Sequence, residues 1–436
     1  MPSQGGLIQL VAKGAQDVYL TGNPDVTFFK VVYRRHTNFS RESIQQSIVG
    51  TPSPGSTVSC EIGRFGDLIS GMYLEFETEL QATTGTHTQG SRGDVLNTYF
   101  YRQAIEFVEL EIGGQKIDKH YGRWLDMWYT LTQSGSDKSK NALIGTSHGR
   151  PHYVPLMFWF NRNPGLSLPL ISLQYHEVKV NIKFGTGSST DAWSQPHNAE
   201  GNVDSNGNNT RLPYSGMSKI STAKLWVDYI FLETEERKAF AKLSHEYLIE
   251  QVQYTGGFSV PQNTTSGFQF GARLDFNHPV KELVWVLEDS DGYPTYEHDD
   301  ITITFNGTER FAKRSSEFFT VIQPYYHHTC NVSPSVQLGI HVYSFALRPE
   351  QHQPSGAANF SRIDNVRLQI GKVNKNLASN IGVVTTSAGY KSETVGWWQN
   401  NGRGDWQAGA GSLHIFAFSY NVLRVVSGMG ALAYST

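Results

Sequence analysis

The feature that most constrains the fold of this 436-residue chain is an internal repeat with a spacing of roughly 190 residues. Apolar and polar residues alternate over positions 108–112 and run into Gly113-Gly114. The same alternation over positions 301–305 runs into Asn306-Gly307, 193 positions later. Such alternation is typical of β-strands, and the residue pairs that follow it are turn residues.

Three further landmarks recur in the same order. Residues 155–160 have a counterpart at 342–347, shifted by 187; residues 178–182 at 366–370, shifted by 188; and residues 229–232 at 420–423, shifted by 191. Such nearly constant shifts indicate two copies of one β domain. A doubled domain is one way to build a symmetric assembly.

Composition supports an all-β chain. Aromatic residues make up 12%, charged residues only 17%, and there are 42 glycines, a mixture typical of strands joined by many turns. The expected strands of the first half are 26–33, 45–49, 58–62, 71–79, 105–112, 153–160, 176–184 and 224–232. Those of the second half are 248–255, 267–276, 282–288, 300–306, 320–323, 337–347, 366–370 and 414–426. Eight strands per half is the number in a jelly roll, so we predict two tandem eight-stranded jelly rolls with a few short helices in loops.

The boundaries follow from glycine-rich and charged stretches. Residues 1–25 are expected to form an N-terminal arm, 26–235 the first jelly roll, 236–246 a short solvated connector, and 247–436 the second jelly roll. One helix stands out in the first half, capped by Asp118, with Trp124, Leu125, Trp128 and Leu131 on one face. We interpret this tryptophan pair as core packing of the helix on the sandwich, in preference to an aromatic ligand platform.

Two long loops correspond in the two halves, at residues 185–223 and 371–413. Both are rich in Gly, Ser, Asn and Thr, and they carry exposed tryptophans, namely Trp193, Trp397, Trp398 and Trp406. Loops of more than about 15 residues without structure are usually functional. We expect both loops to emerge at the same end of their domains and to decorate one face.

Several function classes are disfavoured. A formal net charge of -3 gives no reason to expect direct nucleic-acid binding. Cys60 and Cys330 fall in different halves, which excludes a Cys framework. The N-terminus lacks the pattern of a signal peptide, and no stretch approaches the roughly 18 apolar residues of a membrane span, so we expect synthesis in the cytosol. There is no Gly-x-Ser-x-Gly elbow, Walker loop or zincin motif, and we expect no enzyme activity, no catalytic residues and no cofactor.

Weaker motifs each have a structural explanation. His327-His328 with His341 and His352 is the densest histidine region, but a surface or polar-core role is favoured over a metal site. The acidic turn around Asp289 and Asp291 resembles a hairpin more than a calcium loop. Two Arg-Gly-Asp tripeptides, at 92–94 and 403–405, are explained by turn chemistry in preference to receptor binding.

Blocks of sequence along nearly the whole chain carry a family resemblance. They include GAQDVYLTGNP at 14–24, TFFK at 27–30, YRRHTNF at 33–39, PGLSLPLISLQYHEV at 164–178, WVDYIFL at 226–232, SFAL at 344–347, QPSG at 353–356, YNVLR at 420–424 and SGMG at 427–430. In this order they resemble the major capsid proteins of nucleocytoplasmic large DNA viruses, and are most like those of algal viruses.

The resemblance implies a structural protein of the virion capsid: two jelly rolls side by side, and a homotrimeric capsomer of nearly hexagonal outline that tiles an icosahedral shell. It implies contacts with neighbouring capsomers, with minor capsid and penton proteins, and with the inner viral membrane. It also implies that the long loops point outward and that the chain departs most from the family there. Covalent surface glycans are expected, although the six Asn-x-Ser/Thr triplets do not assign their sites.

The strongest basic cluster is formed by Lys30, Arg34, Arg35 and Arg41, together with His36. In the family the N-terminal region lies toward the inner side of the shell. We therefore hypothesise that these side chains contact acidic partners there, with a solvated strand face as the alternative. A second hypothesis for the whole chain is a carbohydrate-binding β-sandwich that uses the loop tryptophans as sugar platforms.

Overall fold

The computed structural model describes residues 5–25, 28, 35–80, 104–132, 151–185, 217–260, 269–288, 294–295, 298–330, 339–373 and 411–434. It divides into two units, Met1–Phe39 and Ser40–Thr436. The first contains two short helices, α1 (Gly5–Val11) and α2 (Val18–Thr21), whose apolar side chains, such as Ile8 and Leu20, are exposed. Most of the expected strand at 26–33 lies outside the described residues.

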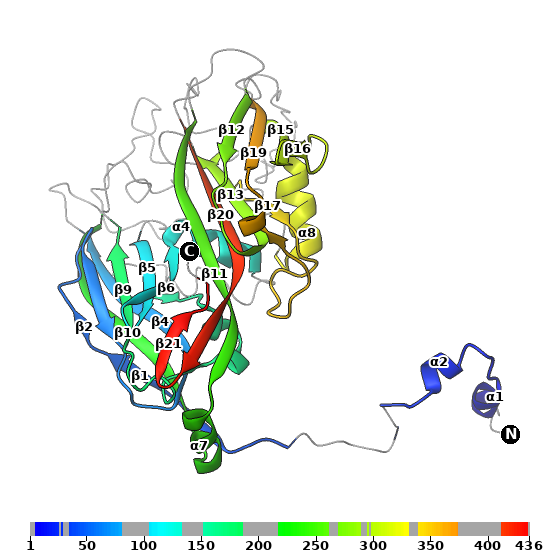
Figure 1. Ribbon diagram of the computed structural model, residues 1–436, viewed down its shortest axis with the longest axis horizontal. Coiled ribbons are helices and arrows are strands. Elements are labelled where there is room, and N and C mark those ends of the chain that lie inside the picture. Colours follow the sequence, from blue (N-terminus) through cyan, green and yellow to red (C-terminus); the bar gives the residue numbers. More distant parts are fainter. Residues whose placement is uncertain are drawn as a thin grey trace, which may run out of the picture. The chain divides into compact units, whose positions relative to one another are not determined.

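The second unit begins with a β-sandwich of two sheets (Figure 1). One sheet has the order β1-β10-β4-β7, with β8 also paired to β4; its strands are β1 (Phe39–Gln46), β10 (Met217–Leu232), β4 (Leu68–Leu80), β7 (His152–Pro155) and β8 (Leu168–Pro169). The other has the order β2-β3-β9-β5-β6; its strands are β2 (Ile48–Val49), β3 (Thr57–Glu61), β9 (Val178–Phe184), β5 (Ile105–Ile112) and β6 (Gln115–Tyr121).

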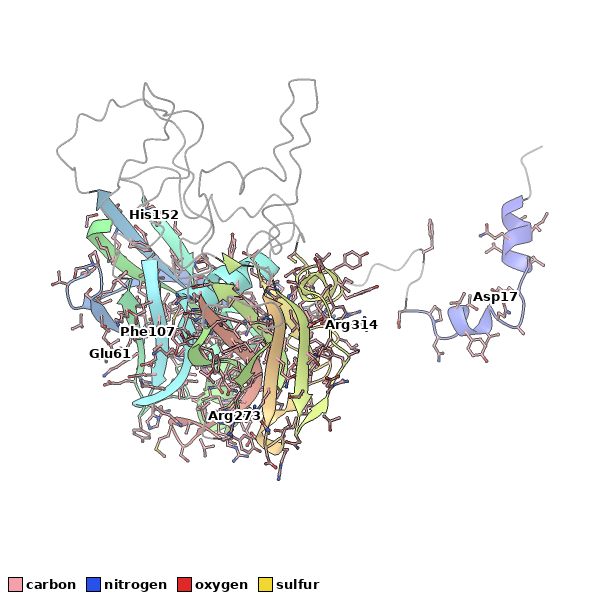
Figure 2. The ribbon with its side chains drawn as sticks, turned by 90° about the horizontal axis from the view of Figure 1, so that it is seen from above. Asp17, Glu61, Phe107, His152, Arg273 and Arg314 are labelled. Carbon is pink, nitrogen blue, oxygen red and sulfur yellow. The ribbon has the colours of Figure 1, made fainter. Side chains whose placement is uncertain are left out.

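A second sandwich follows. One of its sheets has the order β11-β20-β13, and β14, β17 and β18 also pair with β13 and β21 with β20; its strands are β11 (His245–Val260), β20 (Gly411–Val426), β13 (Pro279–Glu288), β14 (Pro294–Thr295), β17 (His341–Ser344), β18 (Ala358–Asn359) and β21 (Met429–Leu432). The other has the order β12-β19-β15-β16, made of β12 (Gln269–Arg273), β19 (Val366–Val373), β15 (His298–Phe305) and β16 (Thr308–Glu309). Figure 2 shows Glu61 and Phe107 on the first sandwich, and Arg273 and Arg314 on the second.

Short helices connect these strands. They are α4 (Gly122–Thr132), α6 (Trp159–Arg162), the 3-10 helix η2 (Pro164–Leu166), α7 (Thr234–Lys242), the π-helix η4 (Phe318–Ile322), α8 (Gln323–His327) and the 3-10 helix η5 (Phe360–Arg362). No helix in the described ranges is long and apolar enough to cross a membrane. The expected connector at 236–246 is largely helix α7, in which Lys238 Nζ lies 3.2 Å from Glu235 Oε1.

Side-chain alternation explains why these segments are strands. In β9, Val178, Val180, Ile182 and Phe184 are buried while the lysines and Asn181 between them are partly exposed. Each sandwich buries its own apolar cluster between its two sheets. At about 25 cal/mol per Å² of buried apolar surface, these two clusters are the main source of folding free energy.

The predicted repeat is confirmed by topology and register. In the first sandwich β1-β10-β4-β7 faces β3-β9-β5-β6, and in the second β11-β20-β13-β17 faces β12-β19-β15-β16. The two hairpins of the sequence repeat are β5–β6 and β15–β16. The residues of both turns have positive φ angles: 58° and 79° at Gly113-Gly114, and 50° and 85° at Asn306-Gly307. This is the turn type that matches the twist of paired strands.

The registers also match individual residues between the sandwiches. Phe76 pairs with His152, their rings 5.5 Å apart, and Trp285 pairs with His341 at the same ring distance. On β4, Leu74 lies two residues before Phe76 and pairs with Leu225 of β10. On β13, Leu283 lies two residues before Trp285 and pairs with Ala417 of β20. Trp226 of the first sandwich therefore occupies the position of Phe418 in the second.

Three local predictions are wrong. Asp118 does not cap the helix but lies inside strand β6, and α4 begins at Gly122. The expected strand at 153–160 ends at Pro155, and Trp159 and Phe160 belong to helix α6, where they fill the first core. The expected strand at 320–323 is helical, because Phe319 packs against the second core while Ile322 faces solvent.

The first core also receives side chains from strands of the second half. Ile249 on β11, and Leu423 and Val425 on β20, pack in the same apolar cluster as Leu74 and Leu110. The two 16-residue strands therefore run from one sandwich into the other. Packing thus crosses the sequence position at which the two jelly rolls were predicted to meet.

Candidate functional site

Of the four residues in the predicted basic cluster, the structure describes Arg35 and Arg41, which belong to different units. Lys30 and Arg34 lie outside the described residues, and Arg35 is exposed in the first unit. Arg41, on β1, points over the outer face of the first sandwich, where its Nη2 donates to Asp228 Oδ2 at 2.6 Å. The arginine is more than half exposed, so this ion pair contributes at most about 1 kcal/mol. The role of the four residues in assembly remains a prediction.

The four histidines have separate surroundings. Nδ1 of His327, at the end of α8, lies 3.1 Å from the Leu347 carbonyl oxygen. His341 is buried, with Nε2 2.7 Å from Ser316 Oγ. Burial lowers the pKa of His352. His328 is buried between two carboxylates. The polar-core interpretation therefore describes His328 and His341.

An apolar seam joins the two sandwiches. Helix α4 turns Leu125 and Tyr129 toward the first core, and its opposite side toward the outer face of β11, β20 and β13. On that side Trp128 lies 4.8 Å from Phe418 and Trp124 lies 5.8 Å from Phe416, measured between ring centroids. The tryptophan pair is core, as predicted, but the core is shared between the two halves of the chain.

A buried ionic cluster lies beside this seam. Lys281 on β13 is fully buried and donates to Glu250 on β11. Arg162 Nη2, at the end of α6, lies 2.6 Å from the other carboxylate oxygen of Glu250. Burial lowers the pKa of Lys281, although Glu250 opposes that shift. Because Arg162 belongs to the first sandwich, the cluster fixes the orientation of the two sandwiches.

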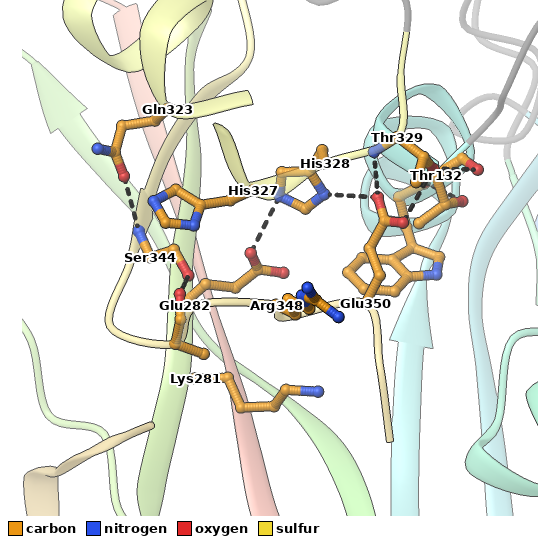
Figure 3. Close-up of polar contacts among 12 residues, drawn as sticks. Thr132, Lys281, Glu282, Gln323, His327, His328, Thr329, Ser344, Arg348 and Glu350 are labelled. Carbon is orange, nitrogen blue, oxygen red and sulfur yellow. Dashed lines mark hydrogen bonds and ion pairs between the residues drawn. The ribbon is translucent and has the colours of Figure 1, made fainter. Parts of the chain in front are cut away.

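A second buried network surrounds His328 (Figure 3). Its Nε2 lies 3.0 Å from Glu282 Oε2, and its Nδ1 lies 3.0 Å from Glu350 Oε1. Burial alone would lower the pKa of His328, but the charges and hydrogen bonds of both carboxylates outweigh it and raise the pKa to about 9. The backbone N–H of the neighbouring Thr329 donates to Glu350 Oε1 at 2.9 Å, and its hydroxyl oxygen lies 2.9 Å from Glu350 Oε2 and 3.2 Å from the carbonyl oxygen of Thr132 on α4. This network therefore also ties the two halves together.

Among the described residues, two groups of neighbouring aromatic side chains lie on the outside of the sandwiches. The first is on the outer face of β4, β7 and β10, where Tyr73 stacks on Trp226 with centroids 6.3 Å apart and lies 6.2 Å from Tyr153. The second is on the helix η4–α8, where Tyr325 and Tyr326 are 70% and 71% exposed. Exposed aromatic patches of this kind mark sites of protein association. The arrangement as a whole supplies packing surfaces, and the polar clusters serve to hold the seam.

The loop tryptophans, both Arg-Gly-Asp tripeptides and the core of the acidic turn lie outside the described residues. The basis of the seam was missed in the sequence. Arg162 and Glu250 are 88 positions apart, and Glu282 and His328 are 46 apart, so no local pattern could pair them. The apolar surface of α4 was the one local indication of the seam, because this helix has buried residues on two opposite sides.

Two sandwiches of one topology in a single chain, held by a buried seam, define a double jelly roll. Two family models match: "Major capsid protein N-terminus" over residues 27–233 and "Large eukaryotic DNA virus major capsid protein" over residues 236–431. The chain belongs to this family of major capsid proteins of large eukaryotic DNA viruses, and its role in the virion capsid is structural.

Individual relatives agree. The chain is 42% identical to the major capsid protein of Pyramimonas orientalis virus and 39% identical to that of Paramecium bursaria Chlorella virus 1, in each case over 99% of both proteins. It is similar to the solved PBCV-1 VP54 structure, with a TM-score of 0.72 and 34% identity over 94% of this chain and 100% of that one. The Faustovirus major capsid protein shares the fold, with a TM-score of 0.58 and 13% identity over 95% of this chain and 94% of that one. Nothing in these relatives or in the described residues favours the carbohydrate-binding hypothesis.

Proposed function

We propose that three copies of this chain form a capsomer of nearly hexagonal outline, and that such capsomers tile an icosahedral shell. The observation that carries this proposal is the repeated topology, with the same two sheet orders in both sandwiches. Three chains then present six similar lobes, so threefold symmetry suffices for sixfold packing. The seam supports the proposal because it holds the two lobes of each chain in one fixed relation.

The partners in this proposal are the other two subunits, neighbouring capsomers, minor capsid and penton proteins, and the inner viral membrane, with synthesis in the host cytoplasm. The basic residues Lys30, Arg34, Arg35 and Arg41 are proposed to face the inner side, where they would attract acidic partners. Reversing Arg34 and Arg35 to Glu should leave the trimer intact and impair shell assembly. Normal particles from that variant would contradict the role of the cluster.

Light scattering on the purified full chain tests the trimer. The expected mass is about three times the chain mass of 48.7 kDa, and it should persist on dilution through the micromolar range. A monomer at high protein concentration would overturn the proposal. A dimer would also do so, because two chains present only four lobes.

A further inference from the structure

The exposed side of helix η4–α8 is a stripe of large apolar residues. Ile322, Tyr325 and Tyr326 are 43%, 70% and 71% exposed, while Phe319 and Gln323 on the opposite side are buried. Leu347, 73% exposed, lies beside the stripe, since its carbonyl oxygen is 3.1 Å from His327 Nδ1. We call these four exposed residues the α8 stripe.

Helix α4 occupies the same place in the first sandwich. It connects the end of the β5–β6 hairpin to β7, as η4–α8 connects the end of the β15–β16 hairpin to β17. On α4, Trp124, Met127 and Trp128 follow the spacing i, i+3, i+4, which places them on one helix face. Ile322, Tyr325 and Tyr326 have the same spacing. The α4 residues are covered by the second sandwich, whereas the α8 residues are exposed.

A matching receiving surface exists on the first sandwich. Trp128 packs on Phe418, and Trp124 on Phe416, in the outer face of the second sandwich. By strand register, Trp226 and Lys224 of β10 occupy the positions of Phe418 and Phe416. Trp226 is stacked on Tyr73 and only partly covered. We call this outer face of β4, β7 and β10 the β10 face.

The chemistry of the two surfaces is complementary. On the β10 face, Glu75 accepts from Trp226 Nε1 at 2.7 Å and from Lys224 Nζ at 3.2 Å, so an aromatic centre has a polar edge. A tyrosine suits such a surface, because its ring can cover an indole while its hydroxyl bonds a lysine or a carboxylate.

We infer that the α8 stripe of one subunit packs on the β10 face of the next subunit, and so repeats between chains the contact that α4 makes within a chain. This inference rests on the proposed trimer and names the surfaces that form it. The stripe and the face are different surfaces of one chain, so the contact is head-to-tail. In a trimer the six lobes then form a closed ring. Contacts through α4, within a chain, alternate around it with contacts through α8, between chains.

The first test removes the stripe. Tyr325→Ala/Tyr326→Ala should raise the trimer dissociation constant at least about tenfold in sedimentation equilibrium, with an unchanged circular dichroism spectrum. The matched control is Tyr175→Ala/Tyr434→Ala, which removes two tyrosines that are 75% and 60% exposed elsewhere on the molecule and should leave the dissociation constant unchanged. Equal dissociation constants for the stripe variant and the wild type would overturn the inference.

The second test joins the two surfaces. In a Cys330→Ser background, Ile322→Cys and Lys224→Cys together should give covalent dimers and trimers under oxidation, since these positions match Trp124 and Phe416. Either cysteine alone should give none. Trimers that form normally without such cross-links would overturn this inference and leave the proposed function standing. A monomeric wild-type chain would overturn both.

Discussion

At the scale of single residues, His328 shows how a buried charge is held. Both ring nitrogens face carboxylate oxygens at 3.0 Å, and a carboxylate can only accept, so both nitrogens must donate and the ring is an imidazolium. Burial opposes this charge, yet Glu282 and Glu350 raise the pKa to about 9. Glu350 in turn has a lowered pKa, because hydrogen bonds from His328 and Thr329 outweigh its burial.

This shift predicts a loss of stability at alkaline pH. The folded-state pKa of about 9 lies above the ordinary histidine pKa of 6.5, so the contribution is complete below about pH 6.5 and is lost as pH rises through 9. Its size is on the order of 3 kcal/mol. Urea unfolding measured from pH 6 to 10 should show this decline in the wild type and a flatter profile in His328→Gln. Replacement of the exposed His36 by Gln should leave the wild-type profile unchanged; a flat wild-type profile would contradict the assignment.

The ionic cluster around Glu250 predicts an asymmetry between its members. Glu250→Gln leaves Lys281 and Arg162 buried without their common counter-ion, which should cost about 3–5 kcal/mol of unfolding free energy. Lys281→Met leaves Glu250 paired with Arg162, so it should cost less than half as much. Urea unfolding at pH 7 measures both. Equal costs would mean that Arg162 does not compensate Glu250.

At the scale of elements, the two glycines of the β5–β6 turn have similar backbone conformations but different surroundings. Gly113 and Gly114 both have positive φ, where a side chain costs about 1–2 kcal/mol. A Cβ on Gly113 would lie 2.3 Å from His176 Nδ1, whereas one on Gly114 meets nothing within 4 Å. The His176 ring is itself held, with Nδ1 3.0 Å from the Gly430 carbonyl oxygen of β21.

Gly113→Ala should therefore destabilise the chain clearly more than Gly114→Ala. The second variant measures the backbone cost alone and serves as the control. Thermal unfolding followed by circular dichroism compares them, and a Tm difference of several degrees is expected for each extra kcal/mol. Matching Tm values would show that His176 moves aside without cost.

Strand β6 shows why some elements were not predictable. Its sequence, QKIDKHY, has one aliphatic residue and reads as a polar segment, yet Asp118 and His120 are buried with Asp118 Oδ2 2.8 Å from His120 Nε2. The backbone N–H of Val252, from the second half, donates to Asp118 Oδ1 at 3.1 Å. Asp118 is buried against a residue 134 positions away, so the sequence around it contains no pattern that predicts its burial. The β5 and β9 strands, by contrast, alternate visibly and were predicted closely.

At the scale of the whole molecule, the sequence repeat predicted two similar sandwiches but not how they combine. The repeat depends on periodicity within each half, and periodicity carries no information about contacts between halves. The α4 seam, the Arg162–Glu250 pair and the shared strands β11 and β20 depend on such contacts. The candidate assembly surfaces follow from the strand registers, which place Trp226 at the position of Phe418.

Because the first core includes Ile249, Leu423 and Val425 from the second half, the first sandwich should not be stable alone. A fragment of residues 40–243 lacks all three side chains, each worth about 1.5–3 kcal/mol when buried, against a typical total stability of 5–15 kcal/mol. Expressed alone, it should aggregate or melt without a cooperative transition. Co-expression with residues 244–436 should restore a soluble complex with a cooperative transition. A cooperative thermal transition of the isolated fragment, seen by calorimetry, would show instead that β11 and β20 are dispensable to the first core.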